Sequence, residues 1–234
     1  MSSSGVSSPT EYTALEVDQA PKRPGIYAWY IRTDLSDFDS QDAVEGGIDL
    51  AEERFLTSLA RLADCFSPES VRLTGRGAYG SRWQGQLESP SLRAEIDQTT
   101  ESAPAANRLR FVAGDARRRS ALIHLLQRSV PAFAAPVYVG VTARSLRARL
   151  NEHKNDYDDA MKLLGAEPGI ARTLRDEGSS FGQRLAGAGV ALDQLVVFVL
   201  PVELDDVPHK QREDAANAIE SYLHRLFQPT FGRR

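Results

Sequence analysis

The chain has 234 residues, of which 41% are hydrophobic and 26% charged, as is ordinary for a globular protein. No run of about eighteen apolar residues occurs, so we expect no transmembrane helix. The net charge of −4 counts against a nucleic-acid-binding protein, and the single cysteine, Cys65, excludes an internal disulfide. With no secretory leader at its start, the sequence predicts a reducing, cytoplasmic setting.

The charge is distributed unevenly along the chain. Residues 1–70 hold 5 basic and 13 acidic side chains, a balance of −8, whereas residues 71–120 hold 9 basic and 5 acidic, a balance of +4. All basic residues of this middle segment are arginines, and they include the run 117–119. Phosphate binding needs a local positive surface and not a positive total. The segment is therefore a candidate nucleic-acid surface, with dispersed surface arginines as the alternative.

The N-terminal half predicts one strand and two helices. Residues 1–20, rich in serine and other polar residues, predict a loose tail. The apolar stretch 25–32 predicts a buried strand, and apolar residues at helical spacing predict helices over 48–66 and 117–128. Many glycines and polar residues over 73–107 predict irregular structure or short strands there.

The C-terminal half alternates strands with helices. We expect a strand over 137–142, then a helix that begins after an N-cap at Ser145 and ends near residue 164. The apolar run 195–202 predicts another strand, and a final helix is expected from about 206 to 227. The predicted core face of this last helix consists of Ile219, Tyr222, Leu223 and Leu226.

Three strands, with helices after the second and the third, predict an α+β fold. More than a hundred residues separate the first two strands. The stretch between them is therefore expected to form a substructure of its own.

Two short motifs combine a strand tyrosine with a glycine, namely Gly25-Ile26-Tyr27 and Tyr138-Val139-Gly140. A strand tyrosine taken singly most often packs in a core. The glycines would let a substrate approach the backbone closely, although strand ends carry glycines for other reasons too. Either motif alone is weak evidence for a site.

Charged residues on two of the helices offer chemistry suited to phosphate. Arg149 and His153 are four residues apart and share one helical face, which we expect to differ from the apolar stripe of that helix. The planar fork of arginine suits phosphate, and Glu220, beside the core face of the last helix, could bind a hard cation such as Mg²⁺. Ordinary surface residues are the alternative for all three, and His124 and His224 are expected to be structural.

The order of these motifs resembles that of the GIY-YIG nuclease family. Gly25-Ile26-Tyr27 corresponds to the first family motif, and Tyr138-Val139-Gly140 to the second with a valine variant. The stretch 146–150 followed by His153 resembles the family's L-x-x-R-L helix, and 218–229 resembles its E-x-x-L … P ending. The resemblance covers less than half of the chain.

Three features depart from the family pattern. The gap between Tyr27 and Tyr138 is far longer than usual, and the asparagine often found after the terminal proline is absent. The arginine lies one place further from the second tyrosine than usual, so Arg147 competes with Arg149 for its role. Arg149 is preferred because of its spacing to His153.

The resemblance implies an α+β fold with a small three-stranded antiparallel sheet flanked by helices and a large mixed insertion. Residues 21–34 and 131–234 would form the nuclease core. Residues 35–130 would be an inserted element in contact with DNA, and residues 1–20 a flexible tail.

By the same resemblance, the chain is expected to be a Mg²⁺-dependent DNA endonuclease. Glu220 would hold the Mg²⁺ ion that stabilises the leaving 3′ oxygen, and Arg149 would bind the scissile phosphate. Tyr27, with His153, would take the proton of the attacking water, while Tyr138 would position that water. The arginines expected to contact DNA are Arg117, Arg118, Arg119 and Arg147.

The biological setting implied by an insertion at this place is restriction or host defence, with DNA repair or a mobile element as alternatives. A non-catalytic nucleic-acid-binding protein that keeps the fold is the competing class of function. An unrelated α+β protein with coincidental motifs is the third. Cleavage of a palindromic site would imply a homodimer, because two active centres must face two strands.

Overall fold

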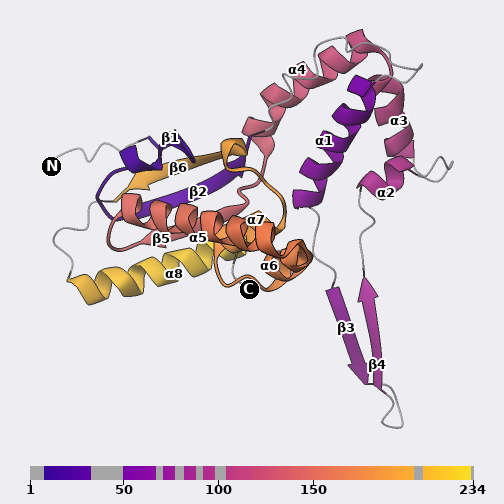
Figure 1. Cartoon of the computed structure of the whole chain (residues 1–234). Helices are drawn as coiled ribbons and strands as arrows, with labels where there is room; N and C mark the ends of the chain where they lie inside the picture. Colours follow the sequence, from indigo (N-terminus) through magenta and orange to yellow (C-terminus); the bar gives the residue numbers. More distant parts are fainter. Residues whose placement is uncertain are drawn as a thin grey trace. The chain divides into compact units, whose positions relative to one another are not determined.

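The computed structural model describes most of the chain and divides it into two compact units. The first unit comprises residues 1–32 and 130–234, and the second residues 33–129. In the part of the chain that is described, eight α-helices and six strands form an α+β structure (Figure 1). The described residues are 8–32, 50–66, 71–76, 82–87, 92–97, 104–202 and 208–232.

A four-stranded antiparallel sheet, in the order β1-β6-β2-β5, forms the base of the first unit. Its strands are β1 (Thr10–Thr13), β2 (Gly25–Ile31), β5 (Tyr138–Thr142) and β6 (Leu195–Pro201). The α+β class is confirmed, and the three predicted strands are all present. The expected sheet of three strands is nevertheless wrong, because β1 pairs with the outer edge of β6.

β1 lies inside the stretch that the sequence predicts to be a loose tail. The chain continues from β1 into a 3₁₀ turn at Val17–Gln19, and Ala14, Val17 and Ala20 are buried. The prediction of a tail is therefore wrong for residues 8–20, while residues 1–7 lie outside the described part. A strand at a sheet edge is held by backbone hydrogen bonds and needs no apolar run, so local hydrophobicity does not reveal it.

Two helices lie on the face of the sheet that carries the two motif tyrosines, and a third packs on one of them. The two helices are α5 (Leu146–Ala166) and α7 (Phe181–Gly187), and α6 (Ala171–Glu177) packs on α7. The predicted N-cap of α5 is confirmed, because the Ser145 hydroxyl accepts a hydrogen bond of 3.3 Å from the Ala148 amide. α7 packs closely on α5 at Gly182, where any Cβ atom would clash with the His153 carbonyl and the Tyr157 amide.

The last helix, α8 (His209–Phe227), packs against β5 (Figure 1). Its predicted core face is wrong for three of four residues, because Ile219, Tyr222 and Leu226 are 41%, 62% and 57% exposed, whereas Leu223 is half-buried. The side of α8 that is turned inward instead carries a small residue and polar groups, which are Ala216, Glu220 and His224. The apolar spacing of this helix therefore marks its outer face.

The second unit contains a helical core and a hairpin. Four helices enclose the core: α1 (Leu50–Phe66), α2 (Leu92–Asp97), α3 (Pro104–Ala113) and α4 (Ala116–Phe133), whose last turn belongs to the first unit. The buried residues of this core are Phe55, Leu56, Leu59, Ala60, Ile96, Ala113 and Ile123. The predicted helix over 48–66 is confirmed over 50–66, and residues 48 and 49 lie outside the described part. Over 73–107 we expected irregular structure or short strands. β4 and the end of β3 fit that expectation, whereas α2 and the start of α3 were not predicted.

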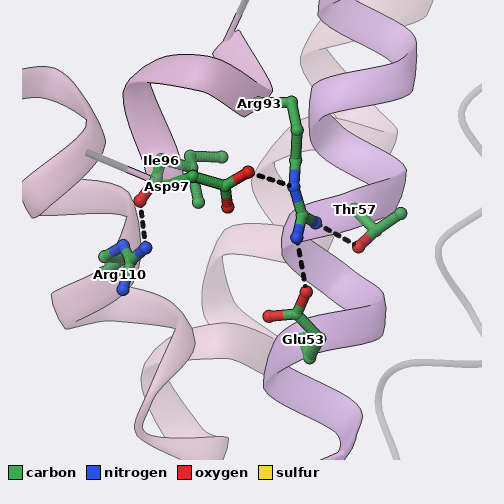
Figure 2. A network of polar contacts seen from close by, with 6 residues as sticks. All are labelled: Glu53, Thr57, Arg93, Ile96, Asp97 and Arg110. Carbon is green, nitrogen blue, oxygen red and sulfur yellow. Dashed lines mark hydrogen bonds and ion pairs between the residues drawn. The ribbon is translucent and has the colours of Figure 1, made fainter. Parts of the chain in front are cut away.

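A network of polar contacts ties α1 to α2 (Figure 2). The Arg93 guanidinium contacts the Glu53 carboxylate at 2.8 Å, the Thr57 hydroxyl at 2.7 Å and the Asp97 carboxylate at 3.0 Å. Arg110 of α3 donates to the Ile96 carbonyl. Two arginines of the basic middle segment are thus engaged inside the second unit.

The remaining elements of this unit are β3 (Val71–Arg76) and β4 (Arg82–Leu87), which pair only with each other as an antiparallel hairpin. Among the described helices, none combines the length and the apolar character that a membrane crossing requires.

Candidate active site

The register of the sheet brings the two glycine-tyrosine motifs face to face. β2 pairs with β5 so that Tyr27 lies opposite Gly140 and Trp29 lies opposite Tyr138. A Cβ atom at position 140 would clash with the phenol ring and hydroxyl of Tyr27. Gly140 is therefore required so that the Tyr27 ring can lie across β5, and the two motifs form one structural unit.

The Tyr27 hydroxyl lies 2.8 Å from Nε2 of His153, and this contact is buried. Tyr27 is 1% exposed and His153 is 3% exposed. His153 therefore does not lie on a separate polar face of α5, as the sequence analysis expects. It belongs to the buried stripe of that helix, together with Leu150 and Tyr157.

The Tyr138 ring packs beside the rings of Tyr27 and His153. Its ring centroid lies 6.1 Å from that of Tyr27 and 5.3 Å from that of His153, and it stacks on Phe181 at 4.7 Å. Phe181, the first residue of α7, also contacts the Trp29 ring. Sequence reasoning missed Phe181, and no local signal connects it with the tyrosine motifs.

Arg149 and Arg147, the two candidates for the phosphate-binding arginine, have different environments. Arg149 is partly exposed, forms an ion pair with Glu152 at 2.7 Å, and lies near enough to Tyr27 to lower the pKa of that phenol. Arg147 donates from Nε to the Ala20 carbonyl at 2.8 Å and so anchors the segment that precedes β2. Of the two guanidinium groups, that of Arg149 therefore belongs to the site.

The pKa of the Tyr27 phenol lies well above its ordinary value. Burial is the main cause, and the neighbouring Tyr138 and the Glu220 carboxylate raise the pKa further, while Arg149 lowers it. For Arg149, burial lowers the pKa but Tyr27 and Glu152 outweigh it, so the guanidinium stays charged. At neutral pH the site therefore holds a neutral phenol beside a permanent cation.

The direction of the Tyr27–His153 bond depends on the tautomer of the imidazole. When Nε2 carries the ring proton, it donates to the Tyr27 oxygen. When Nε2 is the unprotonated nitrogen of the neutral ring, it accepts the phenol proton of Tyr27. The geometry thus provides a path by which a proton can pass from Tyr27 to a base.

α8 contributes two residues beside the site, Glu220 and the histidine His224. The Glu220 carboxylate is 26% exposed and lies 3.9 Å from Nε2 of His224. The same nitrogen donates to the Val139 carbonyl at 2.6 Å, and the ring lies 5.9 Å from that of Tyr138. Sequence reasoning treated His224 as structural and missed its place beside Glu220, although the spacing of four residues on one helix indicated it.

The described residues contain no group of three or more His, Cys, Asp and Glu side chains that could hold a metal ion. Mg²⁺ often keeps several waters and binds through one or two carboxylates together with substrate phosphates. The partly exposed Glu220 carboxylate fits that kind of binding. It does not fit a closed protein cage, such as that of a structural metal.

The three consecutive arginines expected to contact DNA lie on α4 and differ from one another. Arg117 is exposed, and Arg118 lies 3.9 Å above the Phe111 ring and contacts Asp115 at 3.6 Å. Arg119 is 2% exposed and donates to the Ala113 carbonyl. The expectation of a phosphate-binding role is corrected for Arg119, whose guanidinium satisfies a buried carbonyl. Arg147 is only half-buried and engages the Ala20 carbonyl through Nε alone, so its contact with DNA stays a prediction.

Comparisons of the chain with protein-family models, with curated proteins and with solved structures give no match.

Proposed function

We propose that the chain is a Mg²⁺-dependent endonuclease that hydrolyses phosphodiester bonds of DNA. One observation carries the proposal: the buried bond between Tyr27 and His153 lies beside a charged Arg149, and Glu220 is near enough to raise the pKa of that phenol. Hydrolysis of a phosphodiester needs a proton acceptor for water, a cation for the phosphate and a metal for the leaving oxygen. Tyr27 and His153 would supply the proton acceptor, Arg149 would supply the cation, and Glu220 would be a ligand for the metal.

In the proposed reaction, Tyr27 acts as a relay and not as a preformed phenolate. Because its pKa is raised, the phenol can accept the proton of the attacking water only while its own proton passes to Nε2 of His153. The water oxygen forms the new bond to phosphorus, the bond from phosphorus to the 3′ oxygen breaks, and His153 ends as an imidazolium. The 3′ oxygen leaves with the electron pair of the broken bond and takes a proton from solvent. Mg²⁺ bound at Glu220 would supply positive charge at the leaving oxygen.

Arg149 has two tasks in this proposal. Its guanidinium binds the scissile phosphate, whose charge increases in the transition state. Its positive charge also lowers the pKa of the buried Tyr27 phenol, which favours transfer of the phenol proton to His153.

The test is cleavage of plasmid DNA in Mg²⁺ by the full chain and by single variants. Glu220→Gln and Arg149→Ala are each expected to lower the rate by at least about a hundredfold. Asp214→Asn, an exposed carboxylate on the same helix as Glu220, serves as the matched control and should cleave like the wild type. Cleavage that persists in Glu220→Gln at the wild-type rate contradicts the proposal.

The burial of Tyr27 favours one second candidate, a non-catalytic DNA-binding protein with the same pocket. In that case the phenol and imidazole serve only to hold the sheet to α5. DNA would be retarded in a gel by the wild type without any strand being cut, in Mg²⁺ or Mn²⁺. The same experiment therefore separates the two functions.

A further inference from the structure

Three positively charged residues lie at the N-terminal end of α5. Lys22 belongs to the loop before β2, and Arg144 and Arg147 lie on either side of the N-cap residue, Ser145. Lys22 and Arg144 are exposed, and Arg147 is half-buried. More than a hundred residues of sequence separate Lys22 from the two arginines, so only the fold brings these charges to one place.

Backbone hydrogen bonds hold the loop against the helix. The Leu146 amide donates to the Arg23 carbonyl at 2.8 Å, and the Arg147 amide donates to the Pro21 carbonyl at 3.1 Å. Lys22 lies between these two carbonyls in the chain, so its backbone runs along the first turn of α5. The loop and the start of the helix therefore present a single surface.

The amide groups at this end of α5 already have partners inside the protein. Two of them donate to the loop carbonyls, and that of Ala148 donates to the Ser145 hydroxyl. Helix N-termini often bind anions through such amides, but here an anion must be bound by side chains. Nε of Arg147 donates to the Ala20 carbonyl at 2.8 Å and fixes the guanidinium. In the described part of the chain its two terminal nitrogens meet no acceptor, which leaves them for an anion.

Other positive side chains of the first unit are paired with carboxylates. The ion pairs measure 2.7 to 3.5 Å and involve Arg32, Arg149, Lys162 and Arg172. Within the described residues, no ion pair of this kind engages Lys22, Arg144 or Arg147. Their three charges are therefore available to an anionic ligand with several negative groups.

This end of α5 is close to the candidate active site. β2 begins opposite the last residue of β5, so Lys22 and Arg144 lie beyond the same end of this strand pair. Tyr27 is two residues inside that end, which is about 7 Å along an extended strand. Each strand of duplex DNA carries a phosphate about every 3.4 Å of the helix axis. A DNA strand bound by Arg149 would therefore bring its neighbouring phosphates within reach of these cations.

We propose that Lys22, Arg144 and Arg147 bind the phosphates of DNA that adjoin the phosphate held by Arg149. The proposal rests on the proposed function in taking DNA as the partner, and it adds the surface that holds the duplex beside the site. Contacts to phosphate position a duplex and carry no sequence information, so their contribution should be the same for every DNA sequence. A local surface of this kind also agrees with DNA binding by a chain of net charge −4.

The experiment measures binding of a labelled duplex by the full-length protein at several salt concentrations, in Ca²⁺ to limit cleavage. Lys22→Gln/Arg144→Gln removes two exposed charges and keeps the bond from Arg147 to the loop. This double variant should bind at least about tenfold more weakly at low salt. The slope of log affinity against log salt should fall by about 2, since each phosphate contact contributes about 0.9.

Lys162→Gln/Arg172→Gln is the matched control. It also removes two exposed charges from the first unit, and Lys162 lies about 22 Å further along α5 than Arg147. Its affinity and salt slope should equal those of the wild type. Arg147→Gln tests the third cation and should lower the slope by about 1. Because this variant also loses its bond to the loop, urea denaturation must show that it is folded under the assay conditions.

A second measurement locates the contacts on the DNA. Methylphosphonate linkages, which carry no charge, replace single phosphates at successive positions of the duplex. At the contacted positions the wild type should bind severalfold more weakly, whereas Lys22→Gln/Arg144→Gln should lose nothing further.

Several results would overturn the inference. They are a double variant with the affinity and salt slope of the wild type, a control that loses as much, and a methylphosphonate series that affects both proteins equally. Binding of phosphatidylserine vesicles by the wild type, without binding of DNA, would assign these cations to an anionic membrane instead.

Failure of this inference differs from failure of the proposed function. If cleavage depends on Glu220 while Lys22→Gln/Arg144→Gln binds like the wild type, the nuclease stands and this surface does not hold DNA. If the wild type cuts no DNA while the double variant loses affinity and salt slope, the surface holds DNA and the nuclease proposal fails.

Discussion

The Tyr27 hydroxyl and Nε2 of His153 are joined by a buried hydrogen bond of 2.8 Å, across 126 positions of the sequence. The bond links the central strand β2 to the inward face of α5. It is both a structural tie and the proposed proton path. Its two roles can be separated by experiment.

Tyr27→Phe removes only the hydroxyl and should affect both roles. We expect the rate of cleavage to fall by about a hundredfold or more, as is usual when a general base is removed. The free energy of unfolding should fall by about 1–3 kcal/mol, because Nε2 of His153 is left buried without its partner atom. Single-turnover cleavage and urea denaturation measure the two effects, and Tyr222→Phe, on the exposed face of α8, is the matched control. A variant that is destabilised but cuts at the wild-type rate would leave Tyr27 only its structural role.

The stability of the protein should depend on Tyr27 at alkaline pH. The pKa of this phenol is raised in the folded state above the ordinary value of 10.0, so the unfolded chain releases its proton first. The contribution of Tyr27 to the free energy of unfolding is therefore complete below pH 10 and is lost as the pH rises above it. In that range the wild type should lose about 1.4 kcal/mol per pH unit more than Tyr27→Phe. Urea denaturation between pH 9 and pH 11 measures the difference, and parallel curves would contradict it.

Gly140→Ala tests the close contact between the two motifs. The added methyl group would clash with the Tyr27 ring, so we expect a loss of about 1–3 kcal/mol in the free energy of unfolding and a displaced phenol. Gly165→Ala on α5 has open space around the new atom and should be neutral or stabilising by up to about 1 kcal/mol. Thermal denaturation compares the two variants. Equal stability would mean that β5 can shift away from Tyr27.

The neighbouring arginines of α4 should respond differently to substitution. Arg119→Ala removes a buried donor to the Ala113 carbonyl and is expected to lower the free energy of unfolding by about 1–3 kcal/mol. Arg117→Ala removes an exposed charge and should leave stability unchanged. If Arg117 contacts phosphate, this variant lowers the slope of log affinity against log salt by about 1. DNA binding at several salt concentrations and urea denaturation distinguish the two, and a destabilised Arg117→Ala would contradict the assignment.

His224→Ala tests the support that α8 gives to Glu220. Loss of the bond to the Val139 carbonyl should lower the free energy of unfolding by about 1–3 kcal/mol. The concentration of Mg²⁺ needed for half-maximal cleavage should rise, because Glu220 loses the imidazole that lies 3.9 Å from its carboxylate. Metal titrations of His224→Ala are compared with those of His124→Ala, which alters an exposed histidine of α4. An unchanged Mg²⁺ requirement would separate His224 from the metal.

The strands and helices with strong local signals could be predicted from the sequence. Alternation and apolar runs identify β2, β5 and β6, and the Ser145 N-cap identifies the start of α5. β1 could not be predicted, because it depends on the free edge of β6 and not on its own composition. Strand partners and register are long-range properties, and the contact of Tyr27 with Gly140 follows from them.

The orientation of helices was harder to predict than their existence. His153 follows Leu150 by three residues and precedes Tyr157 by four, a spacing that places it in the buried stripe; its polarity suggested otherwise. On α8 the usual relation between apolar residues and the core is reversed, since Glu220 and His224 occupy the inward side. A site that turns polar groups inward defeats an assignment of faces from hydrophobicity alone.

Residues 33–129 leave the sheet after β2 and return to it just before β5, its hydrogen-bonded neighbour, where the Val137 amide donates to the Trp29 carbonyl at 2.8 Å. In topological terms this whole unit occupies the place of a hairpin turn. The entropic cost of closing a flexible loop rises by only about 0.6 kcal/mol per doubling of its length, and a unit that folds by itself reduces that cost. The pairing of β2 with β5 can therefore persist when the length of the chain inserted between them changes.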